Sequence, residues 1–510
     1  MEKLTKNVSL VSLGILTSRI FGYIRDVFIG HYFSSEARGV FFAAWVIPNS
    51  FRRIFGEGAL SASFIPIFSK YLCQDRKEAF RFSSITLNLL LIVTSIFVII
   101  GIALSPIICG IVAPGFTKLG LTGLMSKTLR IILPYLSLVC VFALIMAVLN
   151  SLSKFFIPTF APTMVNLSFI GCIIFLCPHL SEPIIGLAVA VLIGGILQIA
   201  VQIPSLISSG VRYYPEVSLS HPGVKQMAKR MLPSIVGISV FSINSAVDTI
   251  FGSLVGPYAV SALYYANRLV QLPLSLFGTS VGMVSFPTIS RHLAENRMDL
   301  AKETLSWSLR QVIVVILPAA VGLMILGKPI VCLLFEHGKF SHTDVISSYY
   351  VLFFYALGLV FYSGVNSVVS FFYALGDTKT PVMTAIIAML TNICLNWVFL
   401  KPLEEGGIAL ATSIASFVNI SLLLLILRKR IGGIGLSEVK ITFLKSCVAS
   451  LIMAIFLLMV IWFSKNLFFQ VGGGIVIALA VYIVIGKIIG IAEINGILKF
   501  KKGHLDKESG

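Results

Sequence analysis

The chain has 510 residues, of which 57% are hydrophobic and only 12% are charged, and its mean hydropathy is +0.97. Soluble proteins are about 45–50% apolar and about 25% charged, so this composition excludes a soluble enzyme, a nucleic-acid-binding protein, a disordered chain and a disulfide scaffold. The net charge of +18 therefore has to be interpreted relative to a membrane, where the positions of lysine and arginine indicate which loops face the cytoplasm. The composition predicts a polytopic membrane protein.

Apolar stretches of about 20 residues, separated by short polar breaks, predict membrane-spanning helices. Fourteen are expected, near residues 8–30, 38–68, 82–112, 129–150, 157–178, 183–207, 227–254, 258–288, 308–335, 346–374, 381–400, 406–427, 441–463 and 471–494. These runs are too long and too uniformly apolar for a β-barrel. The expected fold is all-α.

The chain resembles itself at a spacing of about 220 residues, as an internal repeat would. Residues 63–72 recur near 285–293, Pro106-Ile-Ile-Cys109 recurs as Pro329-Ile-Val-Cys332, and residues 186–190 recur at 407–411. The offset covers six spans, an even number, so it predicts two parallel lobes and an appended helix pair, an architecture typical of alternating-access transporters. The expected domains are residues 1–220, 221–432 and 433–510, the last with a basic tail.

Basic residues fall mainly in every second connection. Lysines and arginines number 25 on the side of the two termini and 8 on the other side. Cytoplasmic loops carry an excess of lysine and arginine, so both termini are expected in the cytoplasm.

Eight ionisable residues lie inside the expected spans proper, away from their ends, besides Lys487 near the end of the last span. They are Arg19, Arg25, Asp26, Arg52, Arg53, Glu57, Asp248 and Arg268. A charge at the bilayer centre costs at least about 2.5–3.5 kcal/mol, so each of them needs a reason. All five cations are arginines, whose planar fork binds phosphate bidentately. The pattern predicts a cavity that attracts a phosphate or pyrophosphate group.

Charge pairing is the alternative explanation for these residues. Arg53 and Glu57 are i, i+4 neighbours on one expected helix face, and Asp26 could neutralise an arginine on a facing helix. Pairing would account for two cations and leave an excess of three positive charges.

A second set of polar residues suits a small cation. Asn392 and Asn396 are i, i+4 neighbours, Thr412 lies in the next span, and Asp248 is the only acid inside the second group of spans. Hard oxygen ligands of this kind bind small cations. Interhelical hydrogen bonding, which is common for Asn and Thr in membranes, is the alternative.

The chain resembles the MurJ (MviN) lipid II flippases of the MOP exporter superfamily. The resemblance covers essentially the whole chain and is carried by residues 18–26 (SRIFGYIRD), 48–58 (PNSFRRIFGEG), 264–273 (YYANRLVQLP), 113–116 (APGF), 161–163 (APT) and 376–381 (GDTKTP). It implies two six-helix lobes, with a final helix pair whose groove holds the polyprenyl tail. It also implies movement of the lipid-linked peptidoglycan precursor from the cytoplasmic to the periplasmic leaflet of the inner membrane.

The resemblance also implies roles for individual residues. The family's cavity arginines correspond to Arg19, Arg25, Arg52 and Arg268, with Asp26 and Glu57 as partners. Some members hold sodium at positions matching Asp248, Asn392, Asn396, Ile408 (through its backbone) and Thr412. The expected partners are lipid II, membrane lipids and proteins of cell-wall synthesis or division, without nucleic acid. No cofactor is required, and sodium, protons or the membrane potential are the candidates for coupling.

The chain departs from the family pattern at several positions. Many members carry an acid at Gly39, a lysine at Val46 and acids at Asn267 and Gln271, and sodium-binding members usually carry an acid at Asn396. The acids missing near Arg268 make the cavity more positive, and the acid missing at Asn396 weakens the sodium assignment.

Two other functions fit parts of the pattern. A related exporter could move another polyprenyl-linked oligosaccharide. A polytopic enzyme acting on polyprenyl phosphates would also use arginines, but it should show clustered acids or histidines at a membrane face, which the sequence lacks. No enzyme activity is therefore expected.

Overall fold

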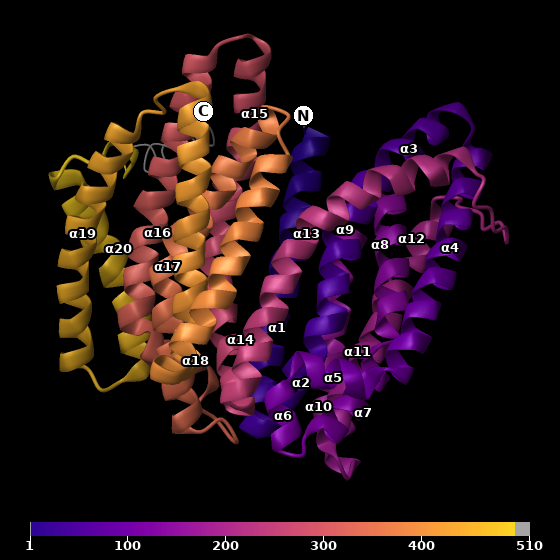
Figure 1. Ribbon diagram of the computed structural model, residues 1–510, viewed down its shortest axis with the longest axis horizontal. Helices are drawn as coiled ribbons and strands as arrows, with labels where there is room; N and C mark the ends of the chain where they lie inside the picture. Colours follow the sequence, from indigo (N-terminus) through magenta and orange to yellow (C-terminus); the bar gives the residue numbers. More distant parts are fainter. Residues whose placement is uncertain (1, 495–510) are drawn as a thin grey trace. The chain divides into compact units, whose positions relative to one another are not determined.

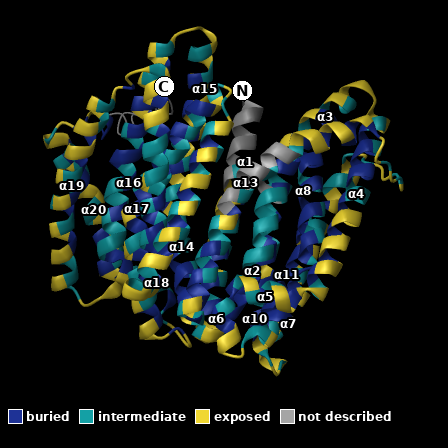
Figure 2. Cartoon of the chain, viewed as in Figure 1, coloured by how far each residue is buried: buried dark blue, intermediate teal, exposed yellow. Residues whose placement is uncertain are grey.

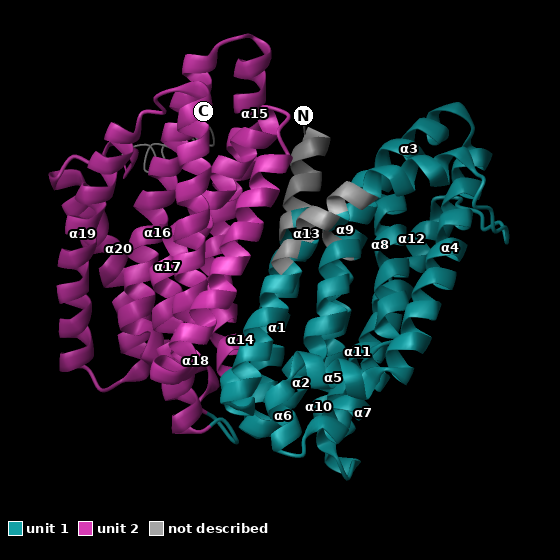
Figure 3. Cartoon of the chain, in the orientation of Figure 1, with its two compact units in different colours: residues 1–260, 337–340 teal, residues 261–336, 341–510 magenta. Residues whose placement is uncertain are grey.

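The computed structural model describes the backbone of residues 2–494, with all their side chains except those of residues 2–10, 12, 56, 57, 232–234, 236–238, 240 and 241. Over this range the chain is almost wholly helical and contains no strand, which confirms the all-α prediction (Figure 1). The chain forms two compact units (Figure 3). Unit 1 comprises Met1–Val260 with His337–Phe340, and unit 2 comprises Ser261–Glu336 with Ser341–Gly510.

The helices up to Val255 belong to unit 1. They are α1 (Glu2–Tyr32), α2 (Ser35–Phe51), the π-helix η1 (Arg52–Ala59), α3 (Leu60–Gln74), α4 (Arg76–Ala103), α5 (Ser105–Val112), α6 (Pro114–Lys118), α7 (Thr122–Ile132), α8 (Tyr135–Ser151), α9 (Phe156–Phe160), α10 (Pro162–Phe175), the 3-10 helix η2 (Cys177–His179), α11 (Pro183–Ala200), α12 (Ile203–Ser208) and α13 (Pro222–Val255). Short polar side chains set several starts. The Ser34 hydroxyl accepts from the Ala37 N–H at 3.3 Å, and Asp75 accepts from the Lys77 N–H at 2.8 Å, which satisfies amides that the helix leaves free.

The remaining helices lead into and build unit 2. They are α14 (Pro257–Pro273), the π-helix η3 (Leu274–Gly278), α15 (Thr279–Ala294), α16 (Met298–Phe335), α17 (His342–Ala374), α18 (Lys379–Ile431), α19 (Leu436–Phe463), the π-helix η4 (Phe469–Gly473) and α20 (Gly474–Ile488). Ser341 and Asp344 form a reciprocal capping box that starts α17.

Ten helices among the described residues are long and apolar enough to cross a membrane. One of them, α18, covers two of the expected spans, and its backbone breaks at Glu404 (φ 47°, ψ −128°). The expected spans near 8–30, 38–68 and 227–254 are helical but are not among the ten. The first two carry four of the five arginines predicted inside spans, and such charges lower the apolarity of a span. The chain is a polytopic membrane protein, and fourteen spans remain a prediction.

The division into units follows contacts, whereas the expected boundaries at 220 and 432 follow the internal repeat. Helix α13 packs against α2, α3, α6 and η1, so it belongs to unit 1, although the repeat assigns its sequence to the second lobe. A repeat marks common origin rather than compactness. The contact-based units therefore do not test the three domains expected from the repeat, and those boundaries remain a prediction.

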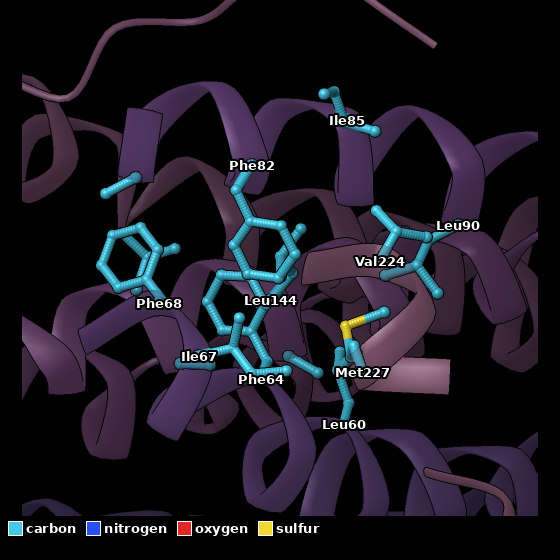
Figure 4. Close-up of a cluster of buried hydrophobic side chains, with 14 of the residues drawn as sticks. Leu60, Phe64, Ile67, Phe68, Phe82, Ile85, Leu90, Leu144, Val224 and Met227 are labelled. Carbon is cyan, nitrogen blue, oxygen red and sulfur yellow. The ribbon is translucent and has the colours of Figure 1, made fainter. Parts of the chain in front are cut away.

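Each unit is held together by its own apolar clusters. In unit 1, Phe64 stacks on both Phe68 and Phe82, with ring centres 5.2 Å apart in each pair, and Leu144 and Met227 close the cluster (Figure 4). In unit 2, one cluster joins α15 to α18 and another joins α16 to α19 and α20. Many outward side chains are large and apolar, and Figure 2 shows them as exposed positions along α4 and α19. This is the pattern of a surface that faces lipid rather than water.

Candidate substrate and ion sites

Helix α1 carries three of the predicted charges. Arg25 donates from Nε and Nη2 to Oδ1 of Asp26, at 3.0 and 2.7 Å, and Asp26 is fully buried. The Arg25 guanidinium also lies 5.3 Å from the ring centre of Phe169 on α10. Arg19, six residues earlier on the same helix, is half-buried. The sequence suggested that Asp26 could neutralise an arginine on a facing helix, and the structure shows Arg25, its neighbour on α1, donating to it.

Arg52 and Arg53 lie on the π-helix η1, which joins α2 to α3. Both are half-buried, and Arg52 donates from Nε to the Asn49 side-chain oxygen at 3.1 Å. π-Helical turns inside α-helices are rare and occur frequently at functional sites. The predicted partner Glu57 lies in η1, but its side chain is outside the described set, so its pairing with Arg53 stays a prediction.

Arg268 lies on α14, in the part of that helix that belongs to unit 2. It is half-buried, as are Asn267 and Gln271, two positions where the family usually has acids. The neighbouring Tyr265 is fully buried and meets Phe335 edge-on, with ring centres 4.8 Å apart. This contact fixes the face that α14 presents to α16.

Four of the five predicted cation ligands come together in unit 2. Asn396 Nδ2 donates to Asn392 Oδ1 at 3.0 Å, and Asn392 Nδ2 donates to the Thr412 hydroxyl at 2.9 Å. Thr412 in turn donates to the Ile408 carbonyl at 3.0 Å. The fifth, Asp248, is half-buried on α13 in unit 1.

The oxygen atoms of these four residues can be assessed as ligands for a small cation. Both asparagines are fully buried, and Asn396 Oδ1 accepts no hydrogen bond within the described part of the chain. A buried oxygen without a donor is costly, and a small cation would satisfy it. The other oxygens already accept hydrogen bonds. The residues therefore fit a cation through neutral oxygens and also fit the alternative of interhelical hydrogen bonding.

Arg38 is a buried cation that the sequence argument missed. It lies at the edge of the span expected near 38–68 and was counted with the basic residues of the connections, but it is fully buried, and its Nη1 donates to the carbonyls of Gly30 and Phe33, both at 3.1 Å. The connection between α16 and α17 packs here as part of unit 1, with the Lys339 N–H donating to the His31 carbonyl at 2.8 Å. The signal available in the sequence was the apolar run that follows Arg38 directly.

Close packing explains the departure at Gly39. A Cβ atom at this position would lie 2.1 Å from the carbonyl oxygen of Pro257, so no side chain fits without movement of the backbone. Gly115 on α6 is as close to α13, since its Cβ would lie 1.8 Å from the Ser253 carbonyl oxygen. Small residues allow membrane helices to approach closely. The acid that many relatives carry at Gly39 cannot be accommodated in this arrangement.

The connection that leads into α13 is tied to α4. Arg81 donates from Nε and Nη2 to the two carboxylate oxygens of Glu216, both at 2.7 Å, and these hydrogen bonds hold the pKa of Glu216 below its usual range. Asn88 donates to the Glu216 carbonyl at 2.8 Å. The buried His221 starts α13 by accepting from the Gly223 N–H at 3.1 Å. The start of α13 is thereby fixed to unit 1.

Within the described residues, no three or more His, Cys, Asp or Glu side chains gather closely enough to hold a metal ion.

Comparison with known sequences gives matches over most of the chain. Residues 29–480 match the family model described as "Lipid II flippase MurJ". A "Probable lipid II flippase MurJ" of Vibrio cholerae is 35% identical over 435 residues, which cover 83% of this chain and 82% of that protein. A "Lipid II flippase MurJ" of Burkholderia cenocepacia is 32% identical over 422 residues, covering 81% of this chain and 82% of that protein.

Solved structures give the same relationship. A "Lipid II flippase MurJ, inward closed conformation" matches with a TM-score of 0.77 at 28% identity, over 94% of this chain and 98% of that one. A MATE-family multidrug transporter of the MOP superfamily, in an inward-facing conformation, matches with a TM-score of 0.68 at 15% identity, over 85% of this chain and 99% of that one. At that identity the second match concerns the fold alone.

Proposed function

Because the chain belongs to the lipid II flippase MurJ family, we propose that its intramembrane arginines hold the pyrophosphate of lipid II while the polyprenyl-linked precursor crosses the membrane. The chain is a lipid II flippase by its membership, and its role in building the cell wall follows from that substrate. The assignment of the arginines rests on one observation: Arg19, Arg52, Arg53 and Arg268 are half-buried cations on helices of a membrane protein. Such charges are retained where they serve a function.

Arginine suits this substrate for a physical reason. Its fork forms two parallel hydrogen bonds to phosphate oxygens, and the guanidinium is less strongly hydrated than an ammonium group. The guanidinium of Arg25 donates twice to the fully buried Asp26. We assign Arg25 and Asp26 to shaping the anion site and Arg19, Arg52, Arg53 and Arg268 to contacting the substrate, with Glu57 beside them.

The transport cycle would be alternating access of the two lobes around the head group. An inside-negative potential favours outward movement of an anion by about 2.3 kcal/mol per charge per 100 mV. No bond is made or broken in such a cycle, so the chain needs no catalytic group. A sodium ion held by Asp248, Asn392, Asn396, Ile408 and Thr412 is a second source of coupling, supported by the buried Asn396 oxygen that accepts no hydrogen bond within the described residues.

The test is translocation of the precursor in cells that depend on this gene. Charge-assisted hydrogen bonds contribute about 1.5–3 kcal/mol each, so Arg19→Ala and Arg268→Ala should each slow translocation about 10- to 100-fold. Arg19→Lys should also be slowed, because it keeps the charge but loses the fork. Arg212, an exposed arginine in the α12–α13 connection, provides the control as Arg212→Ala. Normal translocation by Arg19→Ala and Arg268→Ala would count against the assignment.

The location follows the same reasoning. The proposed site of action is the inner membrane, with both termini in the cytoplasm, as the 25-to-8 distribution of basic residues favours. Reporter fusions at the carboxyl terminus test this, since a periplasmic phosphatase should stay inactive there and a cytoplasmic fluorescent protein should fold. Membrane lipids and proteins of wall synthesis or division are the proposed partners besides lipid II.

A further inference from the structure

A groove of about 520 Å³ opens on unit 1, among helices far from the candidate arginines in sequence. It is lined by Val98 and Ile99 of α4, Pro134 and Leu138 at the start of α8, and Leu192 and Ile196 of α11. All three helices belong to segments long and apolar enough to span a membrane. The groove therefore lies where hydrocarbon chains surround the protein.

The shape of the groove follows from its residues. Pro134 has no N–H to donate, so the helical path breaks between α7 and α8 at this point. Ser137, one turn further on, is too small to fill the space that the break leaves. Six of the eight lining residues are apolar, the other two being Ser95 and Ser137, so the groove suits an apolar occupant.

Arg130 precedes the lining residue Pro134 by four positions in the sequence. Arg130 is on α7, before the break at Pro134, and its hydrogen bond to Ser105 places it beside the end of α4. Its Nε donates to the Ser105 hydroxyl at 2.7 Å, and Ser105 lies 2.9 Å from the Ser126 hydroxyl. Ser105 follows the end of α4 and lies six residues beyond Ile99, roughly 9 Å along a helix at about 1.5 Å per residue. The cation is thus anchored one to two turns from the apolar lining.

The guanidinium keeps most of its capacity to bind. Arg130 is exposed, and within the described contacts only its Nε is used, so both Nη groups are available as donors. Lys127, one turn earlier, is an ordinary surface cation because it pairs with Glu182 at 3.0 Å. No such carboxylate pairs with Arg130 among the described residues.

The internal repeat indicates that the fold does not require an arginine here. In the internal repeat, Pro106 is equivalent to Pro329. At the same offset, Phe353 is the residue equivalent to Arg130. The second half builds the corresponding helix, α17, without a cation at this position. Arg130 therefore serves something particular to the first half.

We propose that the groove and Arg130 form a binding site for an anionic phospholipid of the bilayer. One acyl chain would lie along Val98, Pro134, Leu138 and Ile196, and the phosphate would accept from the Nη groups of Arg130. The site has the volume of a ligand pocket, about 300–1,000 Å³, and it combines an apolar lining with one fixed polar anchor. Its residues are not among the arginines assigned to lipid II, and the proposal does not depend on that assignment.

The test uses the full-length protein, purified in detergent and delipidated, with phosphatidylglycerol as the probe and native mass spectrometry to count retained lipid. Arg130→Gln removes the charge, and Leu138→Trp fills the groove. Each should lower the retained phosphatidylglycerol at least fivefold at matched lipid concentration. Lys127→Gln is the matched control, because it removes a neighbouring cation of the same helix, and it should retain lipid as the wild type does.

Two further comparisons make the result decisive. The wild type should retain phosphatidylglycerol in preference to phosphatidylcholine, and the thermal unfolding temperature should show that both variants are folded. Equal retention by Arg130→Gln and the wild type, or equal retention of the two lipids, would overturn the proposal. Displacement of phosphatidylglycerol by a polyprenyl pyrophosphate at the same concentration would also overturn it, because the site would then belong to the transported lipid.

Discussion

The guanidinium carbon of Arg38 lies 4.5 Å from the centre of the Phe340 ring. Arg38 is fully buried at the start of α2, and Phe340 ends the four-residue segment that unit 1 takes from the connection between α16 and α17. Gly338 allows the approach, because its φ of 61° is in the left-handed region and a Cβ would lie 2.4 Å from the His31 carbonyl oxygen. A buried cation thus holds a segment from the second half of the sequence.

The first prediction concerns this contact. A desolvated cation–π pair contributes about 2 kcal/mol, so Phe340→Leu should lower the stability of the purified protein by at least that amount. Arg38→Lys should be destabilising as well, because lysine cannot keep the guanidinium geometry toward the Gly30 and Phe33 carbonyls. A double-mutant cycle, measured by unfolding in detergent, should give a coupling of about 1–2 kcal/mol. Phe353→Leu, at a more exposed position, is the control, and strictly additive effects would contradict the pairing.

The second prediction concerns the close approach at Gly39. Gly39→Ala would push a Cβ against the Pro257 carbonyl, so it should cost about 1–3 kcal/mol, as overpacking typically does. Gly39→Asp should be worse, because it also buries a charge. Gly123→Ala is the matched control, since nothing lies within 4 Å of its Cβ. Equal unfolding temperatures for Gly39→Ala and Gly123→Ala would show that the helices separate easily.

The sequence predicted the features that follow from hydropathy and charge. It predicted few of the contacts between individual side chains. The helical class and the positions of Arg19 and Arg52 inside helices follow from apolar runs interrupted by charges. The pairing of Arg25 with Asp26 does not, because adjacent residues of a helix do not face each other and only the length of the arginine side chain closes the gap. The burial of Arg38 depends on Phe340, a contact between distant residues that no local pattern contains.

The third prediction concerns pH. Asp377 accepts from the Thr380 and Lys379 amides, both at 3.0 Å, and from Arg430 at 2.6 Å. The Thr380 hydrogen bond in particular lowers the pKa of Asp377 below its usual range. The stabilisation is therefore fully present above the unfolded pKa of about 3.9 and is lost as the pH falls through the lower folded value.

The measurement compares the wild type with Asp377→Asn. At pH 7 the variant should be less stable by about 1 kcal/mol, as for a lost helix cap. The difference should stay constant down to about pH 5 and shrink below about pH 4, where the aspartate of the wild type also becomes neutral. A gap in unfolding free energy that is unchanged at pH 3 would contradict the assignment.

The last prediction separates hydrogen bonding from ion binding at α18. Thr412→Val removes the acceptor of the buried Asn392 amide and should cost about 1–3 kcal/mol in either case. If these residues hold sodium, added sodium should raise the unfolding temperature of the wild type above that in equal potassium, because a ligand of the folded state stabilises it by mass action. Thr412→Val should abolish that difference, whereas Thr391→Val, which removes a threonine hydroxyl that donates to the Ile387 carbonyl of its own helix, should keep it. Identical unfolding temperatures of the wild type in the two salts would mean that the Asn392–Thr412 hydrogen bond serves packing alone. Transport would then be coupled to the membrane potential or to protons.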